Sequence, residues 1–341
     1  MQRVLITGAS GFIGNHMTRR LRDLRIEVHA VSRAPRAPLH GEIWHQCDLR
    51  DEEATSSLMR AVRPQVVFHL AGEVTGTREV AMVPETLRGN LLTAVNLLVS
   101  ATRTPAKLVF AGSVEEPRTG SAAPHSPYSA AKHAATGYAM LFHHLWNVPV
   151  TVLRIAMVYG PGQEDLSKLV PYVATELLRG RSPQVGSGTR LVDWVFVDDV
   201  VDALVAAALS DAADGRALDV GSGSGTSIRA TVDLLHRLAG TAVAPIYGAI
   251  ADRARDRAHI ADVRPAEETL GWRAATPLAE GLARTLRWYA DRLTPHNLTP
   301  AVSASAVPAS TVPASTVPAS TVCGAQPAFH GPFDEPEQQP R

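Results

Sequence analysis

Residues 3–14 read RVLITGASGFIG, and this stretch decides the fold. Residues 3–6 are a short apolar run of the strand type, and the spacing of Met17, Leu21 and Leu24 predicts a helix over residues 15–24. Three glycines occupy the turn between strand and helix, in the order G-x-x-G-x-x-G. A strand, a glycine-rich turn and a helix in this order form the first half of a βαβ unit that binds a dinucleotide.

Each glycine of this turn has its own role in such a unit. Gly8 permits the tight bend, Gly11 lets the backbone approach a pyrophosphate, and Gly14 lets the helix pack closely on the strand. The N-terminus of the helix then presents its N–H groups to the phosphates. We therefore predict that the turn holds the pyrophosphate of a dinucleotide cofactor.

Composition and charge narrow the class of protein. The chain has 341 residues, of which 45% are hydrophobic and 19% charged, and its formal net charge is zero. A globular protein without nucleic-acid or membrane binding is therefore expected. Its two cysteines, Cys47 and Cys323, lie far apart, which argues against a disulfide framework and for a reducing compartment. No signal peptide and no apolar stretch of roughly 18 residues is present, so we expect a cytoplasmic protein.

The end of the second strand bears on the choice of cofactor. Residues 27–31 are of the strand type, and Ser32 and Arg33 follow without a carboxylate. An acidic residue at this place hydrogen-bonds the ribose of NAD, whereas an arginine accommodates the 2′-phosphate of NADP. The sequence thus favours NADP(H), with NAD as the alternative. Arg33 and Arg36 can also be read as exposed loop charges.

Two further strand ends are expected beside the cofactor. Asp48 follows a third strand, where it can hold the adenine, while Asp51 can instead be the N-cap of the next helix. Residues 65–72 form a buried strand, on which His69 is expected to be a core histidine. Asn90 lies in a helical pattern over residues 86–101, either as a plain polar position or as a buried anchor.

Catalytic side chains are predicted at the next strand and helix. Residues 107–111 form a strand that delivers Ser113 at its carboxyl end, where ligands bind in open α/β sheets. Tyr128 and Lys132 share one helix face because they are four residues apart. A tyrosine has an ordinary pKa of about 10, and a nearby ammonium group stabilises its phenolate. Lys132 is therefore the predicted activator of Tyr128, and Ser113 the donor that orients a substrate oxygen. No metal site is predicted.

Together these motifs resemble the extended short-chain dehydrogenase/reductases of the NAD-dependent epimerase/dehydratase group. The resemblance implies a doubly wound α/β domain of the Rossmann type with Ser113, Tyr128 and Lys132 as its catalytic triad. It also implies a smaller C-terminal lobe that binds a nucleotide-diphosphate sugar. The residues that would contact NAD(P) are Gly8, Gly11, Phe12, Ile13, Gly14, Ser32, Arg33, Asp48, Leu49, Leu70, Ala71, Asn90, Tyr128 and Lys132.

The chain departs from the group's pattern in the substrate region. Val114 and Glu115 follow Ser113, so a dehydratase would have a candidate base in Glu115 but no acid at Val114. Arg190 and Arg253 are the candidate substrate-binding residues, and the resemblance matches Arg253 to a diphosphate contact. Arg253 can also be an exposed charge in an arginine-rich stretch. The glycines of residues 219–223 are expected to line the substrate cleft.

We predict three regions: residues 1–160 as the NAD(P)-binding domain, residues 161–294 mainly as the substrate lobe, and residues 295–341 as a disordered tail. The tail repeats the unit Val-Pro-Ala-Ser-Thr, which cannot bury a core. The predicted function is reduction of a keto group on a nucleotide-linked sugar, with Tyr128 as proton donor. The alternatives are a redox-neutral epimerase with retained NAD, a dehydratase, and a non-catalytic nucleotide-binding regulator. A homodimer is compatible with the sequence.

Overall fold

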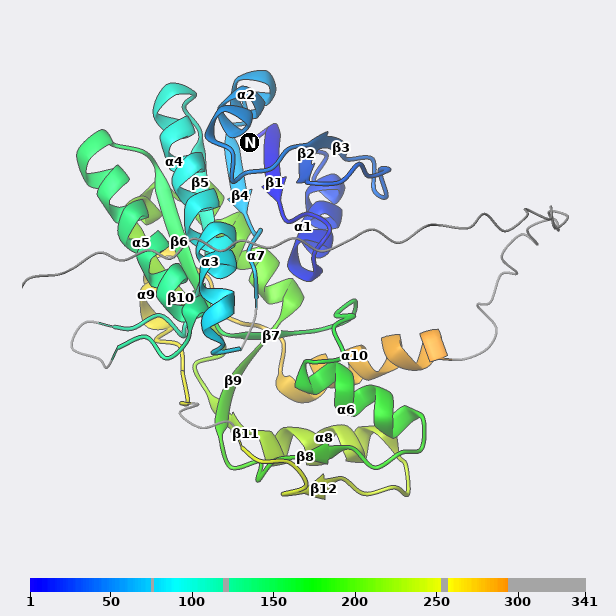
Figure 1. The fold of residues 1–341 in the computed structure, drawn as a ribbon. Helices are drawn as coiled ribbons and strands as arrows, with labels where there is room; N and C mark the ends of the chain where they lie inside the picture. The colour runs from blue at the N-terminus through cyan, green and yellow to red at the C-terminus, as the bar shows by residue number, and fades with distance from the viewer. Residues whose placement is uncertain (75–76, 119–122, 253–256, 294–341) are drawn as a thin grey trace, which may run out of the picture. The chain divides into compact units, whose positions relative to one another are not determined.

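The structure is a computed structural model that describes residues 1–74, 77–118, 123–252 and 257–293. Its main sheet has seven parallel strands in the order β10-β6-β5-β4-β1-β2-β3 (Figure 1). From β1 the chain adds strands toward β3, and from β4 on it adds them in the opposite direction. The bounds are β1 Arg3–Thr7, β2 Glu27–Ser32, β3 Ile43–Gln46, β4 Val66–His69, β5 Lys107–Ser113, β6 Val150–Ile155 and β10 Arg216–Val220.

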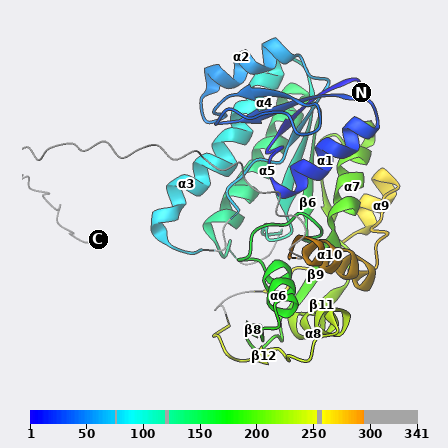
Figure 2. The ribbon, with the colours of Figure 1, turned by 90° about the vertical axis from the view of Figure 1, so that its right-hand side faces the viewer.

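The strands are apolar on both faces because helices cover both faces of the sheet. Along β1, Val4 and Ile6 belong to one buried core and Leu5 to the other. The first core is closed by α1 (Phe12–Asp23), α7 (Val197–Leu209) and α9 (Arg264–Leu270). The second is closed by α2 (Glu52–Val62), α4 (Thr93–Arg103) and α5 (Pro127–Trp146), and Figure 2 shows the sheet between the two sets. The predicted doubly wound α/β fold is confirmed.

A smaller set of elements packs around a third core. It has a three-stranded sheet, β11 (Gly225–Ser227), β9 (Leu191–Phe196) and β7 (Met157–Tyr159), and a two-stranded sheet, β12 (Ile246–Tyr247) and β8 (Gln184–Val185). Helices α6 (Leu169–Leu178), α8 (Ile228–Ala239) and α10 (Leu278–Leu293) complete it. Although β10, α7 and α9 lie beyond residue 160, they belong to the main sheet and its cover. The predicted region boundaries stay predictions, and the tail lies outside the described residues.

The helical region predicted over residues 86–101 contains an irregularity. After a 3₁₀ turn (Val80–Met82), α3 (Val83–Leu87) leads into a π-helical turn (Arg88–Leu92), and α4 follows. Asn90 lies in the π turn, and its side-chain Nδ2 donates to the carbonyl oxygen of Thr86 at 3.1 Å. Periodicity alone could not predict this turn, because it depends on a side chain that bonds the backbone.

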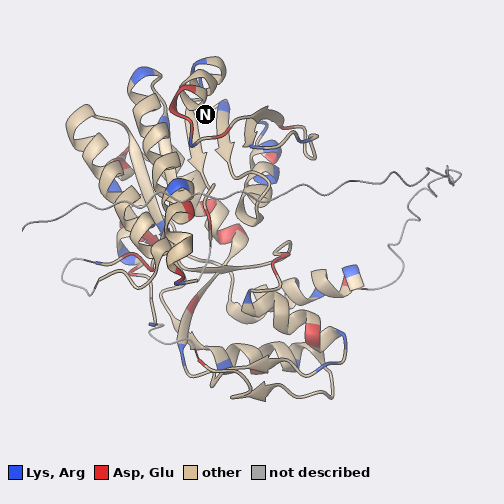
Figure 3. Cartoon of the chain, in the orientation of Figure 1, with Lys and Arg blue, Asp and Glu red and all other residues tan. Residues whose placement is uncertain are grey.

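Acidic and basic residues are interspersed over the described helices and loops (Figure 3). None of the described helices is long and apolar enough to cross a membrane. A second 3₁₀ turn (Asp211–Ala213) joins α7 to β10.

Candidate active site

A large cleft lies at the carboxyl ends of the parallel strands, where the strand order reverses between β1 and β4. Ligands bind at this edge in open α/β sheets. The cleft extends into the smaller set of elements, which contribute Arg190 and Trp194. Most predicted cofactor and catalytic residues line it, namely Gly8, Gly11, Phe12, Ile13, Gly14, Ser32, Arg33, Asp48, Leu49, Leu70, Ala71, Ser113, Glu115, Tyr128 and Lys132.

The glycine turn after β1 can accept a dinucleotide. Gly8 has φ +73°, and a Cβ there would lie 2.7 Å from the amide nitrogen of Ala71. A Cβ on Gly14 would lie 2.1 Å from the carbonyl oxygen of Gly8, so the helix could not pack this closely on the turn. The N-cap of α1 is Gly11, which has no side-chain cap, so the first N–H groups of α1 remain available to a phosphate. These features fit the pyrophosphate of NAD(P).

The ends of β2 and β3 bring charges of both signs to the cleft. Arg33 lies 3.8 Å from the Glu73 carboxylate, which comes from the loop after β4. Asp48 accepts hydrogen bonds from the Arg50 guanidinium at 2.9 Å and from its amide at 3.0 Å, and these bonds lower the pKa of Asp48. Asp51 is the N-cap of α2, bonded by the amide of Ala54 at 2.9 Å. The sequence did not indicate that Glu73 would lie beside Arg33.

Lys132 lines the cleft, although most of its side chain is buried. Its Nζ donates to the carbonyl oxygen of Ala111 at 2.8 Å, and it lies 5.9 Å from the centre of the Tyr128 ring. Burial lowers the pKa of Lys132 to about 8, while the nearby Glu116 carboxylate opposes the shift. Lys132 therefore has a proton that it can release near neutral pH.

Tyr128 lies in the first turn of α5, whose N-cap is Ser126. Burial raises the pKa of Tyr128 above its ordinary value, Glu115 and Glu116 raise it further, and a hydrogen bond with Ser113 opposes them. This differs from the lowered pKa that the spacing to Lys132 predicted. The reason is burial, which destabilises the phenolate, while the Lys132 ammonium group bonds the carbonyl oxygen of Ala111 and lies 5.9 Å from the centre of the ring.

Glu116 is a functional candidate that the sequence analysis missed. Its side chain is buried at 2% exposure and accepts hydrogen bonds from the amide of Ser113 at 2.8 Å and from the Thr136 hydroxyl at 2.7 Å. Burial raises the pKa of this carboxyl, while the two hydrogen bonds and the charges of Arg154 and Lys132 partly offset the shift. The sequence contains no direct signal for this role of Glu116. Arg154, whose charge acts on Glu116, pairs with Gly112 across β5 and β6, and only the strand pairing reveals this neighbourhood.

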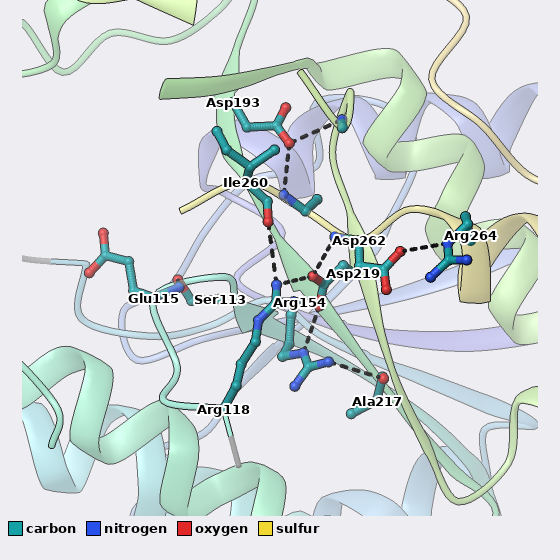
Figure 4. A network of polar contacts seen from close by, with 12 residues as sticks. Ser113, Glu115, Arg118, Arg154, Asp193, Ala217, Asp219, Ile260, Asp262 and Arg264 are labelled. Atoms are coloured by element: carbon teal, nitrogen blue, oxygen red, sulfur yellow. Dashed lines mark hydrogen bonds and ion pairs between the residues drawn. The ribbon is translucent and has the colours of Figure 1, made fainter. Parts of the chain in front are cut away.

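A second buried carboxylate, that of Asp219, holds together the segments beside the end of β10. Asp219 at the end of β10 accepts hydrogen bonds from Arg154 Nε at 2.8 Å, from Arg118, and from the amide of Asp262 at 2.9 Å (Figure 4). Asp219 thus links the loop after β5 to the segment before α9.

Asn90 and His69 lie deeper than the cleft wall. Asn90 is 1% exposed and bonds the carbonyl of Glu73 at 3.1 Å, which makes it a buried anchor of the loop after β4. His69 is buried between the hydroxyls of Thr7 at 2.8 Å and Thr93 at 3.4 Å, and burial lowers its pKa to about 3. His69 is therefore the core histidine that its strand predicted.

The substrate side differs in part from the prediction. Arg190 lines the cleft just before β9, whereas Arg253 lies outside the described residues. The turn at residues 221–223 was expected to line the cleft, and this expectation is wrong. Its amides donate instead to buried Asp193, from Ser222 at 2.7 Å and from Gly223 at 3.1 Å. Among the described residues, no group of His, Cys, Asp and Glu side chains is arranged to hold a metal ion.

Residues 4–221, more than half of the chain, match the NAD dependent epimerase/dehydratase family. The chain belongs to this family. Among its relatives, a UDP-glucose 4-epimerase of Mycolicibacterium smegmatis is 31% identical over 323 residues, which are 85% of this chain and 99% of the relative. A dTDP-glucose 4,6-dehydratase of Streptomyces antibioticus is 31% identical over 318 residues, 84% of this chain and 92% of the relative.

A similar solved structure of the family is that of MoeE5 in complex with UDP-glucose and NAD. It has a TM-score of 0.76 and 32% identity, and the match covers 86% of this chain and all of MoeE5. Membership of the family and the fold are thus established independently of the predicted site residues.

Proposed function

We propose that this member of the family converts a nucleotide-linked sugar through a transient ketone, without net oxidation or reduction. The relatives are an epimerase and a dehydratase, which support the redox-neutral alternative over the keto-group reduction that the sequence analysis put first. Both reactions require oxidation of a sugar hydroxyl and later return of the hydride. They differ in what happens to the ketone in between.

The observation that carries this proposal is the placement of Ser113 and Tyr128 together in the lining of the cleft, with the Lys132 ammonium group 5.9 Å from the centre of the Tyr128 ring. Ser113 holds the sugar oxygen and Tyr128 accepts the proton of the hydroxyl group. NAD, when bound at the glycine turn, supplies the acceptor for the hydride. Tyr128 needs a positive charge nearby to act as a base, since burial raises its pKa in the protein alone.

NAD is the proposed cofactor, although the end of β2 predicted NADP. The family is NAD-dependent by description, and MoeE5 was solved with NAD. A physical reason is the position of Glu73, whose carboxylate lies next to Arg33 and would repel a 2′-phosphate. The preference for NADP is therefore not carried into the proposal.

Two measurements test the proposal. Mass spectrometry of the purified protein should find bound NAD, and Tyr128→Phe should lower turnover of UDP-glucose or dTDP-glucose by about 10²-fold or more, because the variant cannot take the proton. The same variant should retain bound NAD. An empty site that binds NADPH tightly, or a Tyr128→Phe variant with normal turnover, would contradict the proposal.

A further inference from the structure

The loop after β5 places a buried carboxylate next to the proposed triad. Glu116 follows Ser113 by three residues, and only 2% of its side chain is exposed. Its Oε1 accepts from the amide of Ser113 at 2.8 Å, and its own amide donates to the carbonyl oxygen of Ser113 at 3.1 Å. Both main-chain polar groups of Ser113 are therefore bonded by one residue.

The second carboxylate oxygen of Glu116 reaches the helix that carries the rest of the triad. Its Oε2 accepts from the hydroxyl of Thr136 at 2.7 Å, and Thr136 lies one turn beyond Lys132 on α5. A Cβ at Gly112 would lie 2.6 Å from Oε1, so the carboxylate fills the space beside that glycine. Glu116 thus connects the strand end that bears Ser113 to α5.

Both of these donors are uncharged, so the negative charge of Glu116 acts on groups around it. Those groups are Lys132 and Tyr128 on α5 and Arg154 on β6. Arg154 donates to Asp219 at 2.8 Å, so its charge is shared with a second carboxylate (Figure 4). Burial controls the pKa values of Lys132 and Tyr128, and the charge of Glu116 raises both of them. Glu116 therefore favours the ammonium form of Lys132.

We propose that Glu116 is a positioning residue for the triad, which holds the main chain of Ser113 and keeps Lys132 in its ammonium form. The kinetic consequences rest on the proposed function, in which Tyr128 acts as a base beside a positive charge. Turnover then needs the phenolate of Tyr128 and the ammonium group of Lys132 at the same pH. Removal of the charge of Glu116 should lower the pKa of both, so both limbs of the pH profile should move to lower pH. Glu115, from the same loop, also raises the pKa of Tyr128 and remains in place.

The charge of Lys132 can be followed without turnover, because the chain has only three lysines, Lys107, Lys132 and Lys168. Protein labelled with ¹³C at the lysine ε-carbon gives one NMR signal for each, and the signal missing in Lys132→Arg assigns Lys132. In the wild type this signal should titrate at a pH of about 8. In Glu116→Gln its midpoint should fall by about half a pH unit or more, since a charge is removed from a buried neighbour.

The substitution Glu116→Gln is close to the native geometry. Its amide oxygen can still accept from the amide of Ser113, and its NH₂ group can donate to the hydroxyl of Thr136. Glu52→Gln, which removes an exposed carboxylate from α2, is the matched control and should leave the Lys132 midpoint unchanged. Equal midpoints in the wild type and Glu116→Gln would overturn the inference.

Turnover of UDP-glucose separates the hydrogen bond to Ser113 from the charge. At its own optimum pH, Glu116→Gln should keep kcat within about threefold of the wild type, with both limbs displaced to lower pH. Glu116→Leu also lacks the acceptor, so its kcat should fall by about 10-fold or more while NAD stays bound. A Glu116→Leu variant with the kcat and pH profile of the wild type would refute the positioning role.

A wild-type protein that turns over neither UDP-glucose nor dTDP-glucose would count against the proposed function instead. The titration of Lys132 decides the inference in that case, because it needs no substrate.

Discussion

Individual side chains in the cleft are controlled mainly by burial. Burial lowers the pKa of Lys132 to about 8 and raises that of Tyr128. In each case the charged form of the side chain is less stable in the protein than in water. Glu116 has the same effect on both neighbours, since its negative charge raises the pKa of each. The acid–base behaviour of the pair is thus set by groups around it as well as by the four-residue spacing.

Arg33 gives the first prediction at this scale. Although Glu73 disfavours NADPH, Arg33 remains the cation nearest to a 2′-phosphate, so Arg33→Ala should weaken binding of NADPH further, by at most roughly 1.5–3 kcal/mol, and leave NADH nearly unchanged. Calorimetric titration with both cofactors measures the difference. Arg22→Ala, an exposed arginine of α1 paired with Asp23, is the control. Equal losses for both cofactors would show that Arg33 does not approach the 2′ position.

Glu116 gives a prediction for pH dependence. Its folded-state pKa is raised above the ordinary value of 4.5, so the native state binds this proton more strongly than the unfolded state does. The resulting stabilisation is complete below 4.5 and is lost as the pH rises through the folded value. Glu116→Gln resembles the protonated form, so its free energy of unfolding should increase relative to wild type between pH about 4 and about 8.

Urea unfolding of both proteins at the two pH values measures this change. Exposed Glu52→Gln on α2 is the matched control, for which no such trend is expected. A stability difference that stays constant with pH would show that the Glu116 carboxyl is not destabilised by burial.

At the scale of elements, one buried carboxylate connects three segments. Asp193 on β9 is 1% exposed and accepts hydrogen bonds from Ser222 and Gly223, after β10, and from Ala261 at 3.0 Å. The strand, the turn and the segment that carries His259 are therefore held by a single side chain. This explains why the turn does not face the cleft.

Asp193→Ala should lower the free energy of unfolding by about 3 kcal/mol or more, because several buried N–H groups would lose their acceptor. Asp202→Ala on α7 removes an exposed ion pair with Arg20, and a change within about 1 kcal/mol is expected. Chemical denaturation of the two variants makes the comparison. Similar small effects in both would show that solvent can replace Asp193.

At the scale of the molecule, two helices of the main domain expose apolar side chains. Leu141 and Leu145 on α5 are 39% and 53% exposed, and Val83 and Leu87 on the adjacent α3 are 42% and 47% exposed. Apolar surface concentrated on neighbouring helices is typical of a contact with a second copy. We expect the chain to form a homodimer through this surface.

Leu141→Glu should weaken the dimer by about 2 kcal/mol or more, since a carboxylate would be buried at its centre. Light scattering coupled to size-exclusion chromatography should then show a shift toward the monomer. Leu209→Glu on α7, which is 66% exposed, serves as the control and should leave the mass unchanged. A wild-type protein that is monomeric at all concentrations would refute the expectation.

The sequence by itself determined the doubly wound sheet and most of the cofactor and catalytic residues predicted at its carboxyl edge. The glycine turn, the core role of His69 and the N-cap at Asp51 depend on local geometry and on periodicity, which a single chain displays directly. The tertiary structure alone placed Glu73 beside Arg33, Glu116 behind Ser113, and His259 against His125. These contacts either join residues that are tens to more than a hundred positions apart in the sequence or depend on burial. Sequence-distant contacts and burial arise only when separate strands and loops pack together.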